Sequence, residues 1–179
     1  MPREITRSEL VGNRVDLALL LNARELTHEA VEVGTDRGVF ARQFLSVWKG
    51  ELLLCVDAYK PYPEMPWDRM GDLLLASANL APFASRCRLV MADSVEAAAT
   101  LHRPNEFDFV YIDAAHNYES VRQDIAAWWP RIHGGGYLAG HDYDIPGVKE
   151  AVREHIERIG IPAEITSDFY SPSWFMQKR

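Results

Sequence analysis

The sequence predicts an α/β fold, a Rossmann-like three-layer sandwich around a mostly parallel sheet. Short apolar runs alternate with longer stretches of helical period, which is the pattern of right-handed βαβ units. The apolar runs are nearly continuous, as in strands that are buried on both faces. Because 179 residues suffice for one core, we expect a single domain over residues 1–179, with a helical segment at 1–28 and the core at 29–179.

Seven short apolar runs predict the strands. Five of them are expected to form the parallel part of the sheet, in chain order residues 30–33, 52–56, 87–91, 107–112 and 137–140. Two further runs, near 163–166 and 173–177, have no helical stretch between them. They predict a terminal hairpin in which one strand runs antiparallel.

Helices are predicted where apolar residues recur at helical spacing between these runs. The helical stretches lie, in chain order, at 39–48, at 70–78, directly after Ser94, at 121–132 and at 148–159. Residues 5–22 predict one or two helices before the first strand. Gly50 ends the first of the inner helices, and Pro61, Pro63 and Pro66 enforce a loop before the next one.

Composition and charge exclude several classes of protein. Hydrophobic residues make up 47% and charged residues 25% of the chain, which excludes a wholly disordered protein. The net charge of −7 argues against a nucleic-acid partner, because phosphate binding needs a surplus of Lys and Arg. The apolar runs are too short to span a membrane, and there is no secretory segment and no CxxC motif. We therefore expect a cytoplasmic protein with reduced cysteines.

Acidic side chains recur at the ends of the predicted strands. They are Glu32, Asp57, Asp93, Asp113 and Asp142. In an open parallel sheet, ligands bind beyond the carboxyl ends of the strands. A purely structural sheet does not need carboxylates there, so the sequence predicts a ligand site at this edge.

The loop after the first strand reads Glu-Val-Gly-Thr-Asp-Arg-Gly at residues 32–38. Gly34 and Gly38 allow a tight turn and a close approach to a ligand. Their G-x-x-x-G spacing differs from the G-x-G-x-x-G of dinucleotide sites and from a phosphate-binding loop. Glu32 and Asp36 would repel phosphate but suit a cationic ligand. The alternative interpretation is a strand-to-helix turn with glycine for its geometry.

The next two strand ends suit a nucleoside. Asp57 can accept hydrogen bonds from both hydroxyls of a ribose, and its alternative role is to cap a loop. Ala92 and Asp93 can recognise an adenine edge, while Asp93 or Ser94 can also cap the Ala-rich helix that follows.

These motifs resemble a known family. The stretch at 32–38, Val-Asp-Ala-Tyr at 56–59 and Ala-Asp-Ser at 92–94 are similar to successive motifs of class I S-adenosylmethionine-dependent methyltransferases. The stretch at 108–124, together with Gly-Gly-Gly-Tyr-Leu-Ala-Gly-His-Asp-Tyr at 134–143, resembles the small-molecule O-methyltransferases that include macrolide-sugar and cephalosporin-pathway enzymes.

The resemblance implies a seven-stranded sheet in the order 3-2-1-4-5-7-6 with strand 7 antiparallel, and methylation of a hydroxyl on a small-molecule acceptor. It also implies that residues 29–179 form a cofactor-binding core. Glu32, Gly34 and Gly38 would line the methionine and ribose parts of S-adenosylmethionine, Asp57 would hold the ribose hydroxyls and Asp93 the adenine amino group. The other residues expected in the cofactor site are Thr35, Ala58, Ala92, Ser94 and Asp113.

Asp113, His141 and Asp142 occupy the positions at which related O-methyltransferases bind a divalent cation through carboxylates or an amide. Such a cation, Mg²⁺, Mn²⁺ or Fe²⁺, would lower the pKa of the acceptor hydroxyl. His141 departs from an all-oxygen Mg²⁺ site and favours a softer metal such as Mn²⁺, Fe²⁺ or Zn²⁺. The alternative is a general base, His116 or His141, acting without a metal. The expected catalytic residues are therefore Asp113, His116 and His141.

Two rival functions stay open. A nucleotide-binding oxidoreductase on a similar sheet is disfavoured by the missing G-x-G-x-x-G motif, and a non-catalytic binding module could keep the same fold. Acceptor choice would reside in loops, where Tyr59, Tyr62, Trp67 and Tyr143 suggest an aromatic lid. The small size and the tryptophans are compatible with a homodimer.

Overall fold

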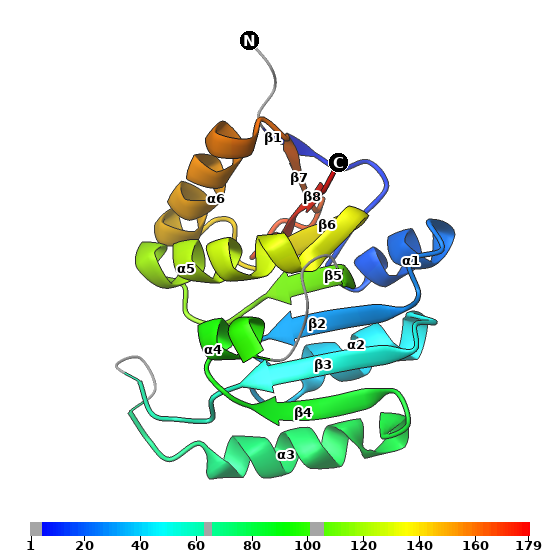
Figure 1. Cartoon of the computed structure of the whole chain (residues 1–179), viewed down its shortest axis with the longest axis vertical. Coiled ribbons are helices and arrows are strands. Elements are labelled where there is room, and N and C mark those ends of the chain that lie inside the picture. Colours follow the sequence, from blue (N-terminus) through cyan, green and yellow to red (C-terminus); the bar gives the residue numbers. More distant parts are fainter. Residues whose placement is uncertain (1–4, 63–65, 101–105) are drawn as a thin grey trace.

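The structure, a computed structural model, describes residues 5–62, 66–100 and 106–179. Within these residues, one sheet of eight strands lies between two layers of helices (Figure 1). The strands are β1 (Ile5–Arg7), β2 (Glu29–Val33), β3 (Leu52–Asp57), β4 (Cys87–Met91), β5 (Phe107–Ile112), β6 (Ile132–Gly140), β7 (Ala163–Ile165) and β8 (Trp174–Gln177). The helices are α1 (Asp16–Ala23), α2 (Val39–Val47), α3 (Met70–Leu80), α4 (Ser94–Thr100), α5 (Tyr118–Trp128) and α6 (Pro146–Ile159). Pro63, which was expected in a loop, lies outside the described residues.

The sheet is mostly parallel, as predicted, and runs in the order β1-β7-β8-β6-β5-β2-β3-β4. Only β8 is antiparallel to its neighbours, β6 and β7, among the described strands. The sheet has eight strands rather than the predicted seven, so its full order differs from 3-2-1-4-5-7-6, although β2 to β8 keep that relative order with β8 as the antiparallel strand. The reason is β1, which adds a strand at the edge beyond β7 and pairs with it in parallel.

The N-terminal segment also differs from its prediction. Residues 5–7 were expected to be helical but form β1, in which Ile5 pairs with Ala163 and Arg7 with Ile165. Isoleucine and threonine favour extended backbone, yet three residues are too few to display a period of two. Tertiary pairing with β7 therefore decides this segment, and the helix is confined to α1.

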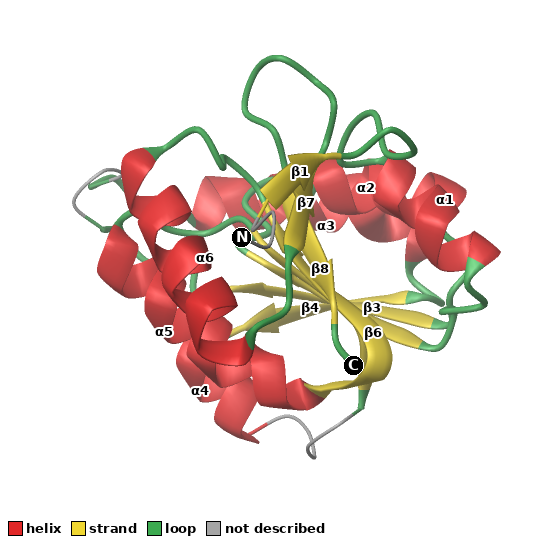
Figure 2. Cartoon of the chain, turned by 90° about the horizontal axis from the view of Figure 1, so that it is seen from above, coloured by secondary structure: helices red, strands yellow, loops and turns green. Residues whose placement is uncertain are grey.

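The two faces of the sheet are covered by different helices. Figure 2 shows α4, α5 and α6 on one face and α1, α2 and α3 on the other. Each layer buries its own apolar cluster. Trp128 of α5 and Trp174 of β8 lie in the first cluster, and Phe44 of α2 and Trp48 lie in the second. Because both faces are buried, the central strands are mostly apolar, with a few buried carboxylates such as Glu32 and Asp57.

Register brings the strand ends together at one edge. Val33 at the end of β2 pairs with Val56 of β3 and with Ile112 of β5, and Ile112 pairs with Gly140 of β6. The residues that follow these strands therefore meet in space. None of the described helices is long and apolar enough to cross a membrane.

Candidate functional site

A cavity of about 630 Å³ lies at this edge of the sheet. Most of the residues predicted for the site line it: Glu32, Gly34, Thr35, Asp57, Ala58, Ala92, Asp93, Ser94, Asp113 and His116. Gly38, His141 and Asp142 are not among its lining residues. The strand-end prediction thus gathers most of its residues around one cavity, with three exceptions.

The two glycines of the first loop have different roles. Gly34 has a φ of 90°, and a Cβ at this position would lie 2.1 Å from the carbonyl oxygen of Asp113. Only glycine therefore lets the turn after β2 approach the end of β5. Gly38 has a φ of 70° at the start of α2, and a Cβ there would press on Leu80 and Ala76 of α3. Gly38 serves the packing of two helices rather than the wall of the cavity.

The Asp57 carboxylate is held by backbone donors on both oxygens. Oδ1 accepts a hydrogen bond from the Tyr59 amide and Oδ2 one from the Asp36 amide, each at 2.8 Å. Tyr59 and Asp36 have φ values of 48° and 49°, in the left-handed region that non-glycine residues rarely adopt. Such strain is typical of functional sites. Here it turns two amides onto one buried carboxylate.

Arg69, which was not predicted as a site residue, binds three carboxylates at this wall through its guanidinium. Nη1 donates to Asp57 Oδ1 at 3.2 Å, Nη2 to Asp36 Oδ1 at 2.7 Å and Nε to Asp72 Oδ2 at 3.2 Å. Only 5% of Arg69 is exposed, and its guanidinium lies 5.7 Å from the rings of Tyr59 and Tyr62. Burial lowers the pKa of Arg69, but the carboxylates outweigh it and the pKa is raised.

Glu32 is a buried carboxyl group at the cavity wall. Its Oε2 atom has no hydrogen-bond partner among the described residues. Burial raises the pKa of Glu32 well above its ordinary value, the neighbouring Thr35 hydroxyl opposes this, and the charge of Asp113 adds to it. Buried polar atoms are normally paired. Because Glu32 lines the cavity and one of its carboxyl oxygens is buried without a partner among the described residues, this residue fits a cationic ligand group.

The far end of the cavity holds Asp93, Ser94 and Asp124. Asp93 Oδ1 accepts a hydrogen bond from the Val95 amide at the start of α4, so its capping role is present. Asp124 of α5, which the sequence did not single out, is buried and lines the cavity. Burial raises the pKa of Asp124 to about 6, a hydrogen bond with Ser94 lowers it, and the charge of Asp93 raises it.

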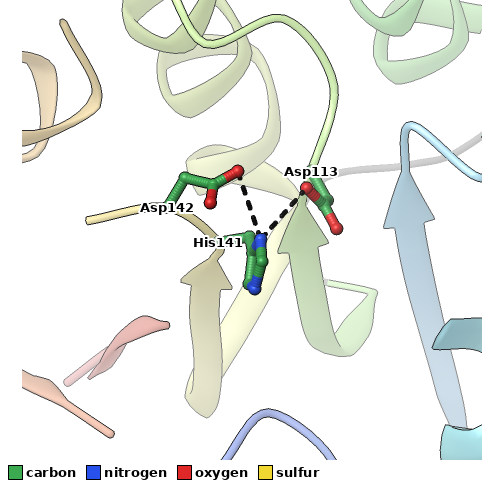
Figure 3. A group of neighbouring side chains, drawn as sticks. All are labelled: Asp113, His141 and Asp142. Carbon is green, nitrogen blue, oxygen red and sulfur yellow. Dashed lines mark ion pairs between the residues drawn. The ribbon is translucent and has the colours of Figure 1, made fainter. Parts of the chain in front are cut away.

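The three predicted metal ligands form a cluster at the ends of β5 and β6 (Figure 3). His141 Nδ1 lies 3.2 Å from Asp142 Oδ2 and 3.7 Å from Asp113 Oδ1. One ligand atom from each residue lies within 4.8 Å of the others. A φ of 54° at Asp142 turns the chain as β6 ends, and its carboxylate points to His141. This spacing and this donor set fit one divalent cation.

Two cations border the cluster. His116 Nε2 lies 2.9 Å from Asp142 Oδ2 and 3.7 Å from Asp113 Oδ1, and these two carboxylates raise the pKa of His116 to about 10. Burial raises the pKa of Asp142, but hydrogen bonds from His116 and His141 outweigh it and the pKa is lowered. Arg14 Nη1 donates to Asp113 Oδ2 at 3.2 Å. In the free protein, His116 and Arg14 thus balance the charge of the two carboxylates.

The four aromatic residues that were expected to form a lid lie in different environments. Tyr143 is 6% exposed and belongs to the apolar cluster under α5 and α6, so its assignment to a lid was wrong. Tyr59 is also buried, and its hydroxyl donates to the Asp36 carbonyl at 2.9 Å. Tyr62 lines the cavity, while Trp67 is 53% exposed. Sequence alone cannot tell a core tyrosine beside a loop from an exposed one.

A family model described as a methyltransferase domain matches residues 31–143, which include the end of β2, all of β3 to β6 and nearly the whole cavity wall. The chain belongs to this methyltransferase family. The expectation of a methyltransferase is therefore confirmed. None of the curated proteins compared with this methyltransferase matches it.

Solved structures share the fold of this methyltransferase at low sequence identity. The O-methyltransferase NovP is 18% identical, with a TM-score of 0.70 over 92% of this chain and 78% of its own. TomG of Streptomyces achromogenes, solved in complex with S-adenosylmethionine, is 16% identical, with a TM-score of 0.68 over 92% and 79%. An O-methyltransferase of Bacillus cereus, solved with S-adenosylhomocysteine, is 14% identical, with a TM-score of 0.65 over 92% and 80%.

Proposed function

We propose that this methyltransferase transfers the methyl group of S-adenosylmethionine to a hydroxyl group of a small molecule. The observation that carries the proposal is the cavity, where the held carboxylate of Asp57 and the unpaired, buried carboxyl of Glu32 face one space. The structural similarity to O-methyltransferases, two of them solved with S-adenosylmethionine or S-adenosylhomocysteine, supports it.

The cofactor roles follow from the chemistry of the wall. Glu32 would bind the cationic methionine part and Asp57 the ribose, while Asp93 would bind the adenine amino group. The smaller wall residues, which would complete the contacts, are Gly34, Thr35, Ala58, Ala92 and Ser94. When bound, S-adenosylmethionine supplies a methyl carbon activated by a sulfonium sulfur.

The transfer itself is an in-line displacement. The acceptor oxygen bonds to the methyl carbon as the carbon–sulfur bond breaks, its electron pair passes to sulfur, and the hydroxyl proton must leave the oxygen. Asp113 and His116 line the cavity beside the metal-ligand cluster. We infer that these residues orient the acceptor hydroxyl and that its proton leaves on this side.

A divalent cation is the finer part of the proposal. Asp113, His141 and Asp142 would hold it, and it would lower the pKa of the acceptor hydroxyl when bound. The imidazole donor favours Mn²⁺, Fe²⁺ or Zn²⁺ over Mg²⁺. The competing candidate is a metal-free reaction in which a histidine takes the proton. The contact of His141 Nδ1 with Asp142 supports His141 in this role, whereas His116, with a pKa of about 10, already carries a proton at neutral pH and is disfavoured.

Cofactor binding is tested by thermal unfolding. S-adenosylhomocysteine should raise the Tm of the wild type, and Asp57→Ala should remove the shift, because the variant loses the ribose acceptor. Absence of a shift at saturating S-adenosylhomocysteine would contradict the proposal, and a shift with NAD(P) instead would favour an oxidoreductase. Binding without methyl transfer to a panel of phenols and sugar hydroxyls would favour a binding module.

Metal dependence is tested on protein stripped by a chelator. Activity should fall and should return with Mn²⁺, Fe²⁺ or Zn²⁺, and titration calorimetry should detect one site per chain. Asp142→Asn should weaken metal binding by about tenfold or more while S-adenosylhomocysteine still binds, because a charged metal ligand is lost but Asp142 does not line the cavity. Full activity in metal-free protein would leave the histidine base as the mechanism.

We further propose that residues 1–179 act as a single domain and that the protein works in the cytoplasm. Pairing of β1 with β7 supports the first statement, because it ties the N-terminal segment to the far end of the core. Two unoxidised thiols, Cys55 and Cys87, with sulfur atoms 3.5 Å apart, support the second.

A further inference from the structure

We propose that Arg69 is a positioning residue for the cofactor: it holds the Asp57 carboxylate in the orientation in which one oxygen stays open to a ribose hydroxyl. The inference rests on the proposed function and adds a residue to it. Its basis is the three hydrogen bonds that the Arg69 guanidinium donates to Asp57, Asp36 and Asp72.

The acceptor sites of Asp57 can be counted. An ionised carboxylate offers about four lone-pair positions. Oδ1 accepts from the Tyr59 amide and from Arg69 Nη1, and Oδ2 accepts from the Asp36 amide. Among the contacts of the described residues, the remaining position lies on Oδ2. Arg69 therefore saturates one oxygen and leaves the other as the ribose acceptor.

Charge gives Arg69 a second effect on the same residue. Asp36, Asp57 and Asp72 all lie within reach of one guanidinium, and like charges this close would repel one another. Without Arg69, Asp57 would lose both a hydrogen bond and the positive charge that offsets the repulsion from Asp36 and Asp72. The planar fork of arginine serves several carboxylates at once, which a lysine ammonium does less well.

Arg69 also links the wall to α3. Its Nε donates to Asp72 in the first turn of α3, while the rings of Tyr59 and Tyr62 flank the guanidinium. Because the guanidinium is almost fully buried, these bonds are poorly screened by solvent. The loop after β3 and the start of α3 are thus fixed against the residue that would receive the ribose.

The test compares Arg69→Gln and Arg69→Lys with the wild type. For Arg69→Gln, the Kd of S-adenosylhomocysteine and the KM for S-adenosylmethionine should rise about tenfold or more, because a charge-assisted bond to Asp57 is lost. The kcat at saturating cofactor should stay near the wild-type value, since Arg69 does not contact Asp113 or His116 among the described contacts. Arg69→Lys should recover part of the affinity.

Two controls separate positioning from folding. Arg42→Gln removes another arginine that connects α2 to α3, through Asn79, but lies outside the cavity, so its Kd should match the wild type. In an Asp57→Asn background, Arg69→Gln should cost little further affinity, because both changes affect the same contact.

Several outcomes would overturn the inference. One is a folded Arg69→Gln protein, judged by its Tm, that binds S-adenosylhomocysteine like the wild type. Another is that Arg69→Gln lowers the affinity for S-adenosylhomocysteine in the Asp57→Asn background by the same factor as in the wild type. If Arg69→Gln fails to fold, an Arg69→Lys protein that binds S-adenosylhomocysteine with the wild-type Kd would also overturn the inference. A wild type that does not bind S-adenosylhomocysteine would overturn the proposed function as well, which distinguishes the two failures.

Discussion

The buried carboxyl group of Glu32 should change its protonation state when the cofactor binds. Burial raises its pKa in the free protein, so it holds a proton at pH values where an exposed glutamate is ionised. A bound cationic group would lower that pKa again, so we predict that a proton is released on binding. The affinity for S-adenosylmethionine should therefore increase with pH until the pH exceeds the raised pKa of Glu32 in the free protein.

Calorimetric titration of S-adenosylmethionine in buffers of different ionisation enthalpy measures this proton. Glu32→Gln is the matched control, because it keeps the shape of the side chain and cannot ionise. Binding enthalpies that do not depend on the buffer in the wild type would contradict the prediction.

Asp124 should make the free protein less stable as the pH rises. Its folded pKa of about 6 lies above its ordinary value, so the folded state binds the proton more tightly. The group therefore stabilises the folded state fully at low pH, and this contribution is lost as the pH rises from about 4 to 6. We predict that Asp124→Asn increases the free energy of unfolding at neutral pH by on the order of 3 kcal/mol. The Tm should rise accordingly at neutral pH and stay unchanged near pH 4. Equal Tm profiles for both proteins across this range would refute the assignment.

At the scale of single residues, sequence alone predicted the strand-end carboxylates because their position follows from the alternation of strand and helix. Arg69 could not be predicted, since its role depends on three carboxylates that come together only in the folded chain. Asp124 was missed for a similar reason. It lies on a helix, where a buried aspartate has the same local pattern as an exposed one.

Among the elements, α6 carries a buried titratable group on its apolar face. His155 is 2% exposed, its Nε2 has no hydrogen-bond partner among the described residues, and the Trp129 ring meets it edge-on. Burial lowers the pKa of His155 to about 4, and the charge of Arg158 adds to this effect. Because the unfolded chain then binds the proton more tightly, the stability of the docked helix should fall as the pH drops from about 6.5 to 4.

We predict that His155→Leu removes part of this acid sensitivity. Thermal unfolding of the wild type and the variant at about pH 7 and pH 5 measures it, and the fall in Tm between the two conditions should be several degrees smaller in the variant. Parallel falls in both proteins would place the acid sensitivity elsewhere.

The long elements were predictable and the short ones were not. The apolar stripe of α6 spans four turns, so its period was unambiguous in the sequence. By contrast, β1 has three residues, and its pairing with β7 is a long-range event that no local pattern encodes. Tyr143 was misassigned for the same reason, because burial under α5 and α6 is decided by distant residues.

For the whole molecule, cofactor binding is linked to folding, because a ligand that binds only the folded protein raises the free energy of unfolding. A ligand present at 100 times its Kd stabilises a protein by about 2.7 kcal/mol, which corresponds to a Tm increase of about 5–10 °C for a chain of this size. This sets the size of the shift expected with S-adenosylhomocysteine and of its loss in Asp57→Ala. A homodimer stays a prediction, which light scattering would test.

The pairing of β1 with β7 has a consequence for synthesis on the ribosome. Ile5 leaves the exit tunnel well before its partner Ala163, because 158 positions separate the two residues along the chain. During translation β1 must therefore wait with its backbone groups unpaired, while β2 to β5 can already assemble. The sheet can therefore be completed at its β1 edge only after translation has passed β7, which makes this edge depend on two distant parts of the chain.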